Sequence, residues 1–309
     1  MRRKFALLGT ITYDRIRSQS GFLWQGLGGV LYQAATFCAL GEEVCLYTLL
    51  SQKLKAEVER ITSGWPNFQQ RGINLVPEAG NEVHLYYPPE GERVEILKSV
   101  VPPLKSDTLL KGLHGHQFEM LMAVFNSGFE LKLKDWQKIV RTISCSIWLD
   151  IHSLCLSREL HRLRRYVPLP EAWAWIEGVN FIQANAKEAA SLLGHPQEHP
   201  SSAELLDFAE KAFLLGTKAL FVTLGKEGVL VITPKGAETI SAAKANQVVD
   251  TTGCGDVFGA ATALKLRAGL EPVEAASFGL ELASRAVFVR GIVETYKIIK
   301  DFQKDSLAP

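Results

Sequence analysis

Short apolar segments alternate along most of the chain with segments in which apolar residues recur every three or four positions. The apolar segments lack regular polar alternation, as is typical of strands covered on both faces, and they lie at residues 4–11, 43–50, 120–125, 145–150, 180–185 and 218–224. Helical spacing is found at residues 30–40, 133–143, 186–194, 202–216 and 257–269. This order predicts an α/β fold with a mostly parallel central sheet and helices on both faces, in a single domain over residues 1–309.

Two stretches interrupt this order, and both are predicted to be β-hairpins. Residues 83–97 have two strand-like arms around the turn sequence PPEG, and residues 229–242 have two arms around PKG. The first hairpin lies early enough to project from the sheet as a flap, on which Tyr86 and Tyr87 either close over a ligand or contact a partner subunit. Residues 195–202 are the most loop-like stretch, but a capped helix start follows directly, so no domain boundary is predicted there.

Composition and charge exclude several classes of protein. The 309 residues are 47% hydrophobic, which is ample for a large core, and the formal charge of +1 provides no field to recruit nucleic acid or an anionic membrane. No apolar run approaches the roughly 20 residues of a membrane span, and the N-terminal apolar stretch is too short for a signal peptide. Five widely spaced cysteines without a CxxC pair indicate reduced thiols, so we expect a cytoplasmic protein.

One segment, residues 158–166, is locally basic, with the sequence RELHRLRRY. A solvated helix face is the simplest interpretation of such a charge run, and an anion-binding role is the alternative. The sequence leaves both open.

The strongest candidate for chemistry is DTTGCGDVFGAA at residues 250–261. Thr251 and Thr252 stand where capping residues belong, and an apolar helical pattern follows. Three small residues therefore form the predicted turn at a helix N-terminus, where open backbone N–H groups make an anion site. Asp256 would face the same anion, which suits a base that accepts a proton from an attacking hydroxyl. Ordinary helix capping remains the alternative.

Two nucleotide-binding motifs are excluded. The glycine spacing GxGxxxG at residues 253–259 is one residue longer than the dinucleotide fingerprint, and it occurs late in the chain instead of after the first strand. The phosphate-binding pattern GxxxxGK[ST] does not occur in the sequence.

The whole stretch resembles the second signature, Asp-Thr-x-Gly-Ala-Gly-Asp, of the ribokinase-like, or pfkB, family of carbohydrate and nucleoside kinases. Here residues 250–256 fit it, with cysteine in place of alanine. The family's first signature, Gly-Gly-x-x-x-Asn-x-Ala, is matched by residues 28–35 except for a glutamine at the asparagine position. Asp14 is the counterpart of an early aspartate, Asn-x-x-Glu is intact at residues 185–188, and Thr-x-Gly-x-x-Gly is found at residues 223–228.

The resemblance implies a three-layer ribokinase-like sandwich that transfers the γ-phosphoryl group of ATP, with Mg²⁺, to a hydroxyl of a small sugar or nucleoside. It implies that Asp256 is the base and that the backbone of Gly253, Cys254, Gly255 and Asp256 is the anion hole. For the acceptor it implies contacts from Asp14, Gly28, Gly29, Gln33 and His152. For the nucleotide it implies contacts from Asn185, Thr223, Gly225, Gly228 and Thr252.

The same resemblance implies that Glu188 and Asn185 hold Mg²⁺ through water, although the pattern Asn-x-x-Glu also fits a helix cap with a capping box. A lid is expected from about residues 12–26 and 83–98. Cys254 either replaces the alanine or becomes an acidic thiol at the helix N-terminus. His152 stands where the family often has asparagine, and it either touches the acceptor or is a surface histidine.

Several alternatives stay open at this level. A monovalent cation and a homodimer formed through the lid are compatible with the sequence. The rival functions are a kinase of vitamin precursors on the same fold, against which Gly28 and Gly29 argue, and a catalytically silent paralogue with a regulatory or scaffold role, against which the intact Asp256, Asn185 and Glu188 argue. A third rival, a dinucleotide-dependent oxidoreductase, lacks a correctly placed glycine fingerprint. Neither nucleic acid nor a membrane is expected as a partner.

Overall fold

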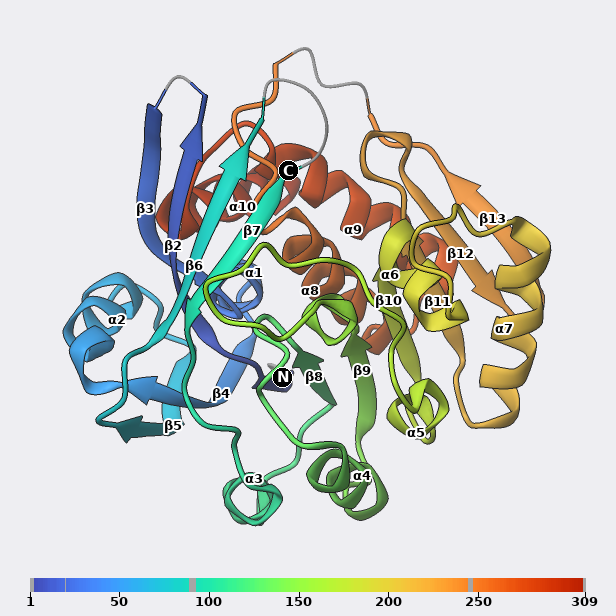
Figure 1. Ribbon diagram of the computed structural model, residues 1–309, viewed down its shortest axis with the longest axis horizontal. Helices are drawn as coiled ribbons and strands as arrows, with labels where there is room; N and C mark the ends of the chain where they lie inside the picture. Colours follow the sequence, from blue (N-terminus) through green and yellow to red (C-terminus); the bar gives the residue numbers. More distant parts are fainter. Residues whose placement is uncertain (1–2, 20, 89–92, 244–246, 308–309) are drawn as a thin grey trace.

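The computed structural model describes residues 3–19, 21–88, 93–243 and 247–307 (Figure 1). Its central sheet has nine strands, in which β12 pairs antiparallel with β11 and with β13, and all other neighbouring strands pair parallel. Their order across the sheet is β13 (Gly236–Ile240), β12 (Val229–Thr233), β11 (Ala219–Thr223), β10 (Phe181–Asn185), β9 (Ser146–Asp150), β8 (Met120–Val124), β1 (Lys4–Leu8), β4 (Glu43–Ser51) and β5 (Phe68–Val76).

Helices cover both faces of this sheet because successive side chains of a strand point to opposite faces. In β1, Phe5 and Leu7 join one buried cluster, and Ala6 and Leu8 join the other. The first cluster is completed by α1 (Leu31–Ala39), α2 (Lys55–Thr62), α8 (Cys254–Arg267), α9 (Pro272–Ala286) and α10 (Ile292–Leu307). The second is completed by α3 (Ser106–Leu113), α4 (Leu133–Thr142), α5 (Ala172–Ile176), α6 (Ala186–Leu193) and α7 (Ser202–Leu214). The predicted three-layer α/β sandwich is confirmed.

A second sheet of four strands stands apart from the central one, at the upper left of Figure 1. Its order is β3 (Gly21–Gly29), β2 (Ile11–Ser18), β6 (Asn81–Tyr87) and β7 (Val94–Ser99). It has a small core of its own, to which β2, β6 and β7 contribute. The predicted hairpin at residues 83–97 is present as β6 and β7, while residues 89–91 of its turn lie outside the described residues. We call this four-stranded sheet the flap.

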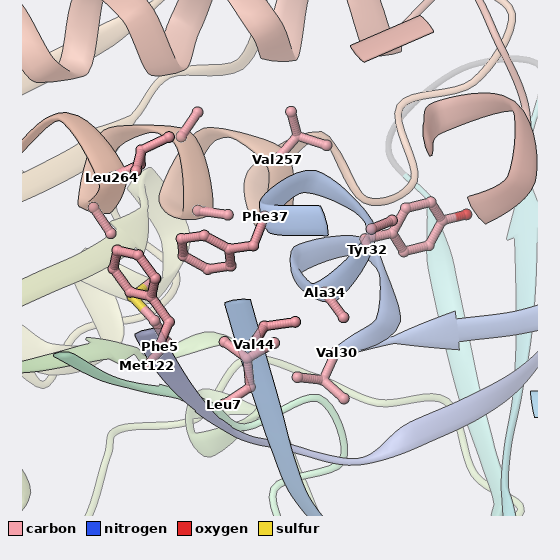
Figure 2. Packing of buried hydrophobic residues seen from close by; sticks show 14 of the residues in the cluster. Phe5, Leu7, Val30, Tyr32, Ala34, Phe37, Val44, Met122, Val257 and Leu264 are labelled. Carbon is pink, nitrogen blue, oxygen red and sulfur yellow. The ribbon is translucent and has the colours of Figure 1, made fainter. Parts of the chain in front are cut away.

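Helix α1 links the flap to the core, since β3 leads directly into it. All nine of its residues are buried, and Phe37 stacks on Phe5 of β1 with ring centroids 4.3 Å apart. Figure 2 shows Phe37 facing Phe5, while Tyr32 lies near the other end of α1 with its hydroxyl group pointing away from the cluster. The beginning of α1 therefore brings a buried polar atom to the edge of the core.

Most of the predicted elements are present with shifts of a few residues at their ends, including the second hairpin as β12 and β13. The helix interpretation of residues 158–166 is wrong: this segment has irregular backbone, in which Leu163 forms an isolated bridge with Ile96 of β7. Among the described residues, no helix has the length and apolar character that crossing a membrane requires.

Candidate active site

A cavity of about 880 Å³ lies where the flap meets the carboxyl ends of the parallel strands and the N-terminus of α8. Open α/β sheets bind ligands at this edge, and the volume suits two small ligands. Its flap end is lined by Thr12, Asp14, Val83, Leu85, Arg93 and Glu95. Its far end is lined by the turn from Thr223 to Gly228 and by apolar residues that include Ala242, Val248, Leu280, Ala283 and Val287.

The signature loop enters the cavity wall through Gly253, which is the N-cap of α8 and has a φ angle of +83°. A side chain there would be strained by this angle and would collide with the ring of Tyr32. The prediction that Thr251 and Thr252 cap the helix is wrong, because no side chain among the described residues caps α8, and Asp250 Oδ1 instead accepts a hydrogen bond from the Thr252 N–H at 2.9 Å.

The first turn of α8 leaves backbone donors open at the cavity. The N–H of Cys254 donates to Thr251 O at 3.2 Å, and the N–H of Val257 donates to Gly253 O at 2.9 Å. Gly255 and Asp256 lie between these two residues, and their N–H groups have no backbone acceptor within the described ranges. The first N–H groups of a helix lack intrahelical partners and attract anions, so this turn can receive a phosphate.

Asp256 lies on the same turn and lines the cavity. Its Oδ1 atom is buried and has no hydrogen-bond partner among the residues that the structure describes. Burial is the main reason that its pKa is raised to about 7, and the nearby Asp14 raises it further, while His152 and Arg93 act in the opposite direction. A carboxylate that titrates near neutral pH is well matched to the work of a general base.

Asp14 lines the flap end from β2. Burial raises its pKa to about 6, although Thr12 and Arg93 favour its charged form. Gly28 on β3 lies against it, because a side chain at Gly28 would collide with the Asp14 carboxylate, whereas the next residue, Gly29, has a φ angle of +63° and lies close to the carbonyl of Thr10. Gly29 lines the cavity but Gly28 does not, so the structure brings only one of this predicted pair to the wall.

Gln33 also lies away from the cavity wall. It is fully buried in α1, and neither polar atom of its amide group has a partner within the described residues. The preceding residue, Tyr32, lines the cavity instead, with a buried hydroxyl group that likewise lacks a described partner. The glycine pair predicted that α1 begins near a ligand, but the spacing did not indicate which side chain of its first turn faces the cavity.

Four neighbouring parallel strands bring polar residues to the centre of the cavity. These residues are Asn126 after β8, Asp150 and His152 at the end of β9, Asn185 at the end of β10 and Thr223 at the end of β11. His152 Nδ1 lies 3.4 Å from Glu188 Oε1. Burial acts to lower the pKa of His152, but Glu188, Asp150 and Glu95 outweigh it and raise the pKa to about 9. A pKa of about 9 favours the cationic form of His152 at neutral pH, beside Glu188.

Asn185 and Glu188 form the capping box of α6. Asn185 Oδ1 accepts from the N–H groups of Lys187 and Glu188, both at 2.9 Å, and Glu188 Oε2 accepts from the Asn185 N–H at 2.7 Å. Both residues line the cavity. Within the part of the chain that the structure describes, no cluster of three or more His, Cys, Asp or Glu side chains could hold a metal ion. The residues therefore fit only an ion that brings its own oxygen ligands, as Mg²⁺ with phosphates and water does.

The far end is built by the turn between β11 and β12. Gly225 and Gly228 have φ angles of +60° and +113°, and both line the cavity with Thr223. A side chain on Gly228 would collide with the carbonyl of Ile240 on the neighbouring β13. The hairpin therefore requires this glycine whatever the turn binds.

The flap contacts the signature loop through Tyr87. Its hydroxyl group lies 3.0 Å from Thr252 Oγ1 and 3.3 Å from Asp250 Oδ1, whereas Tyr86 is 39% exposed. The neighbouring Cys254 is not an acidic thiol, because burial raises its pKa to about 12. Cys254 is thus a small residue at the alanine position.

Several residues of the cavity wall were not predicted from the sequence, namely Thr12, Tyr32, Arg93, Glu95, Asn126, Asp150 and Gln183. A signal existed for Asn126 and Asp150, because each is a polar residue at the carboxyl end of a predicted parallel strand. Arg93 and Glu95 stand on the second arm of the flap hairpin, and nothing in the local sequence shows which face of that arm meets a ligand.

Comparisons with known proteins agree with this geometry. Residues 164–298, less than half of the chain, match the pfkB family of carbohydrate kinases. A ribokinase from Arabidopsis thaliana is 33% identical over 119 residues, which are 38% of this chain and 31% of that protein. The chain thus matches about a third of the length of that relative.

Solved structures extend the likeness to nearly the whole chain. The match with the structure of Arabidopsis thaliana ribokinase complexed with ribose and ATP extends over 98% of this chain and 99% of that one, with a TM-score of 0.73 and 19% identity. A sulfate complex of a pyrophosphate-dependent kinase in the ribokinase family covers 95%, is itself covered to 99%, and has a TM-score of 0.76 and 15% identity. The fold is therefore that of the ribokinase-like α/β proteins. The sequence matches agree with the resemblance to the pfkB family of carbohydrate kinases that the motifs carry.

Proposed function

We propose that this protein is an ATP-dependent kinase that phosphorylates a hydroxyl group of a small sugar or nucleoside. One observation carries the proposal: the unpartnered Oδ1 of Asp256 and the open N–H groups of the same helical turn face one cavity with room for two ligands. A proton acceptor and an anion site at this spacing suit phosphoryl transfer to an alcohol.

In the proposed reaction, the Asp256 carboxylate takes the proton of the acceptor hydroxyl as its oxygen forms a bond to the γ-phosphorus. The bond between that phosphorus and the bridging oxygen of ADP breaks, and the bridging oxygen keeps the electron pair. The N–H groups of Gly253, Gly255 and Asp256 stabilise negative charge on the transferring group. Mg²⁺, when bound, would neutralise phosphate charge, and Glu188 and Asn185 are the residues that would hold it through water.

The division of the cavity supports ATP as the donor. The far end is walled largely by apolar residues, including Ala242, Val248, Leu280, Ala283 and Val287, which suit a nucleobase. Pyrophosphate, the donor named for one similar structure, has no apolar part that would use this wall. The hydrogen-bonding residues Thr12 and Asp14 at the opposite end suit an acceptor with hydroxyl groups, over which the flap would close and exclude water.

The substitution Asp256→Asn tests the mechanism, because it removes the base but keeps the shape of the side chain. We expect turnover to fall roughly 10²- to 10⁴-fold, while ATP affinity measured by calorimetry changes little. Asp107→Asn is a matched control: Asp107 also lies in the first turn of a helix, α3, but it pairs with Lys138 and lies outside the cavity lining. Equal turnover of wild type and Asp256→Asn would overturn the proposed mechanism.

A further inference from the structure

The basic segment at residues 158–166 is not a solvated helix, and its most buried member, Arg164, has a fully enclosed side chain. Its guanidinium donates from Nη1 to Glu95 Oε1 at 2.9 Å and to Ser153 Oγ at 3.1 Å. It also donates from Nη2 to Ser127 O at 3.0 Å and from Nε to Ser157 O at 3.1 Å. Arg164 is thus satisfied by protein groups and is not available to a ligand.

The hydrogen bond from Arg164 orients the side-chain carboxylate of Glu95. Backbone bonds reinforce the contact, since the N–H of Arg164 donates to Glu95 O at 3.0 Å and that of His161 donates to Leu97 O at 2.9 Å. Strand β7 is therefore hydrogen-bonded to residues 158–166 through both backbone and side chains. A carboxylate held by a buried guanidinium on a rigid strand is a preorganised acceptor of hydrogen bonds.

Glu95 lines the flap end of the cavity, where Asp14 also lies, and only Oε1 of Glu95 is used by Arg164. Arg93 Nη2 lies 4.0 Å from Oε2, which is beyond hydrogen-bond distance. Asn126 Oδ1 offers a second point for a ligand, because it is buried at the cavity wall without a partner among the described residues. The flap end therefore presents several unused acceptors of hydrogen bonds.

The charges that line this region are mainly negative. Asp14, Glu95, Glu188 and Asp256 line the cavity, while burial raises the pKa of the neighbouring Asp150 well above its ordinary value, so that Asp150 is not counted among these charges. Against them stand Arg93 and His152, and each of these lies beside a carboxylate already, at 4.0 Å and 3.4 Å respectively. An acceptor with a phosphate or carboxylate group would meet this negative surplus, whereas hydroxyl groups would donate to it.

We propose that Glu95 is an acceptor-binding residue positioned by Arg164, and that the acceptor is an uncharged polyol. This inference rests on the proposed kinase function and narrows its substrate class. Glu95 receives a hydroxyl group of the acceptor on Oε2, opposite the carboxylate of Asp14. Arg164 acts only through Glu95.

The first test compares matched acceptors by ADP release from the full chain with ATP and Mg²⁺. Fructose is paired with fructose 1-phosphate and fructose 6-phosphate, and inosine with its 3′- and 5′-monophosphates. The two phosphates of each set block different hydroxyl groups, so whichever of these hydroxyl groups reacts is still free in one charged acceptor. We expect kcat/KM at least about tenfold higher for the uncharged member. A preference for charged acceptors would overturn the inference alone. No release with any acceptor, in a protein that still binds ATP, would contradict the kinase proposal itself.

The second test is Glu95→Gln, measured with the best uncharged acceptor. We expect KM for the acceptor to rise by roughly 10-fold or more, as for the loss of a hydrogen bond to a charged group, with KM for ATP within about twofold. The matched control is Glu82→Gln on β6 of the same flap, because Glu82 pairs with Arg15 and His84 and is not part of the cavity lining. A deoxy analogue that lacks the bound hydroxyl group should raise the acceptor KM of the wild type, but should raise that of Glu95→Gln very little further. An unchanged KM for the acceptor would overturn the role of Glu95.

The third test is Arg164→Lys, which keeps the charge but loses the guanidinium fork. We expect the acceptor KM to rise as in Glu95→Gln, and the double variant to be no worse in acceptor KM than Arg164→Lys alone. If Arg164 were purely structural, Arg164→Lys would lower the melting temperature and leave the ratio of the acceptor KM to the ATP KM unchanged. That result would overturn the assignment of Arg164 as a positioning residue.

Discussion

Asp256 combines two properties that depend on its exact place. It lies in the first turn of α8, where helix N–H groups attract anions, and its carboxylate is buried enough to titrate near pH 7. The sequence predicted the first property, because small residues followed by a helical pattern mark such a turn. The second could not be predicted, since it depends on the burial of Asp256 and on Asp14, which is far away in the sequence.

The raised pKa of Asp256 predicts how activity depends on pH. The base must be deprotonated to accept a proton, so kcat/KM should rise with pH through about 7 and then level off. The native carboxylate has a pKa above its unfolded value, so the folded state binds the proton more tightly and the charged form costs stability at high pH. Asp256→Asn should therefore melt at a higher temperature than wild type at pH 8, with a smaller gain at pH 5. A wild-type pH profile that is flat between pH 6 and 8 would contradict the proposed base.

Gly253 is predicted to be intolerant of substitution for two separate reasons, its positive φ angle and the ring of Tyr32. Gly253→Ala should therefore destabilise the protein by more than the roughly 1–2 kcal/mol that the angle alone costs. Gly194→Ala is the matched control, because Gly194 has a φ angle of +92° and no atom within 4 Å of the added carbon. Chemical denaturation of both variants measures the difference, and equal losses would show that the contact with Tyr32 is unimportant.

The flap and the signature loop are separate elements that meet through one side chain. Strand β6 carries Tyr87 to the loop that precedes α8, where its hydroxyl group contacts Thr252 and Asp250. Asp250 is held in turn by Arg290, at 3.2 Å. The position of the flap is therefore linked to that of the loop that would bind phosphate.

Tyr87→Phe should weaken this link without changing the core. We expect a several-fold lower kcat and faster hydrogen exchange in β6 and β7, because the flap loses two hydrogen bonds to the loop, each worth about 0.5–1.5 kcal/mol. Tyr86→Phe removes the same atom from the next residue, which is exposed and absent from the cavity lining, and it should change neither quantity. Identical behaviour of the two variants would contradict the link.

At the scale of the whole molecule, the active site depends on both halves of the chain. The flap, α1 and strands β1, β8 and β9 come from residues before 151, whereas Asp256, Glu188 and the far end come from later residues (Figure 1). The cluster on one face of the sheet likewise joins α1 to α8 and α10. The central sheet and both buried clusters contain residues from both halves of the chain, which favours the predicted single domain.

A fragment of residues 151–309 tests this dependence. It contains almost all of the proposed catalytic residues, but it lacks β9, which is one of the two strands that pair with β10, and α1, which packs on α8. We expect the fragment to show no cooperative unfolding transition, while the full chain unfolds in one step. Calorimetry measures both, and a cooperative transition in the fragment would indicate two domains.

The local sequence determined the strands, most helices and the turn at the start of α8, because periodicity and small residues act over a few positions. It also indicated the proposed class of chemistry, since one acid follows a glycine-rich helix start. Tertiary structure alone decided that Tyr32 and not Gln33 faces the cavity, that Asp256 titrates near neutral pH, and that a buried Arg164 orients Glu95. Each of these depends on burial and charge contributed by elements distant in the chain, which no local pattern records.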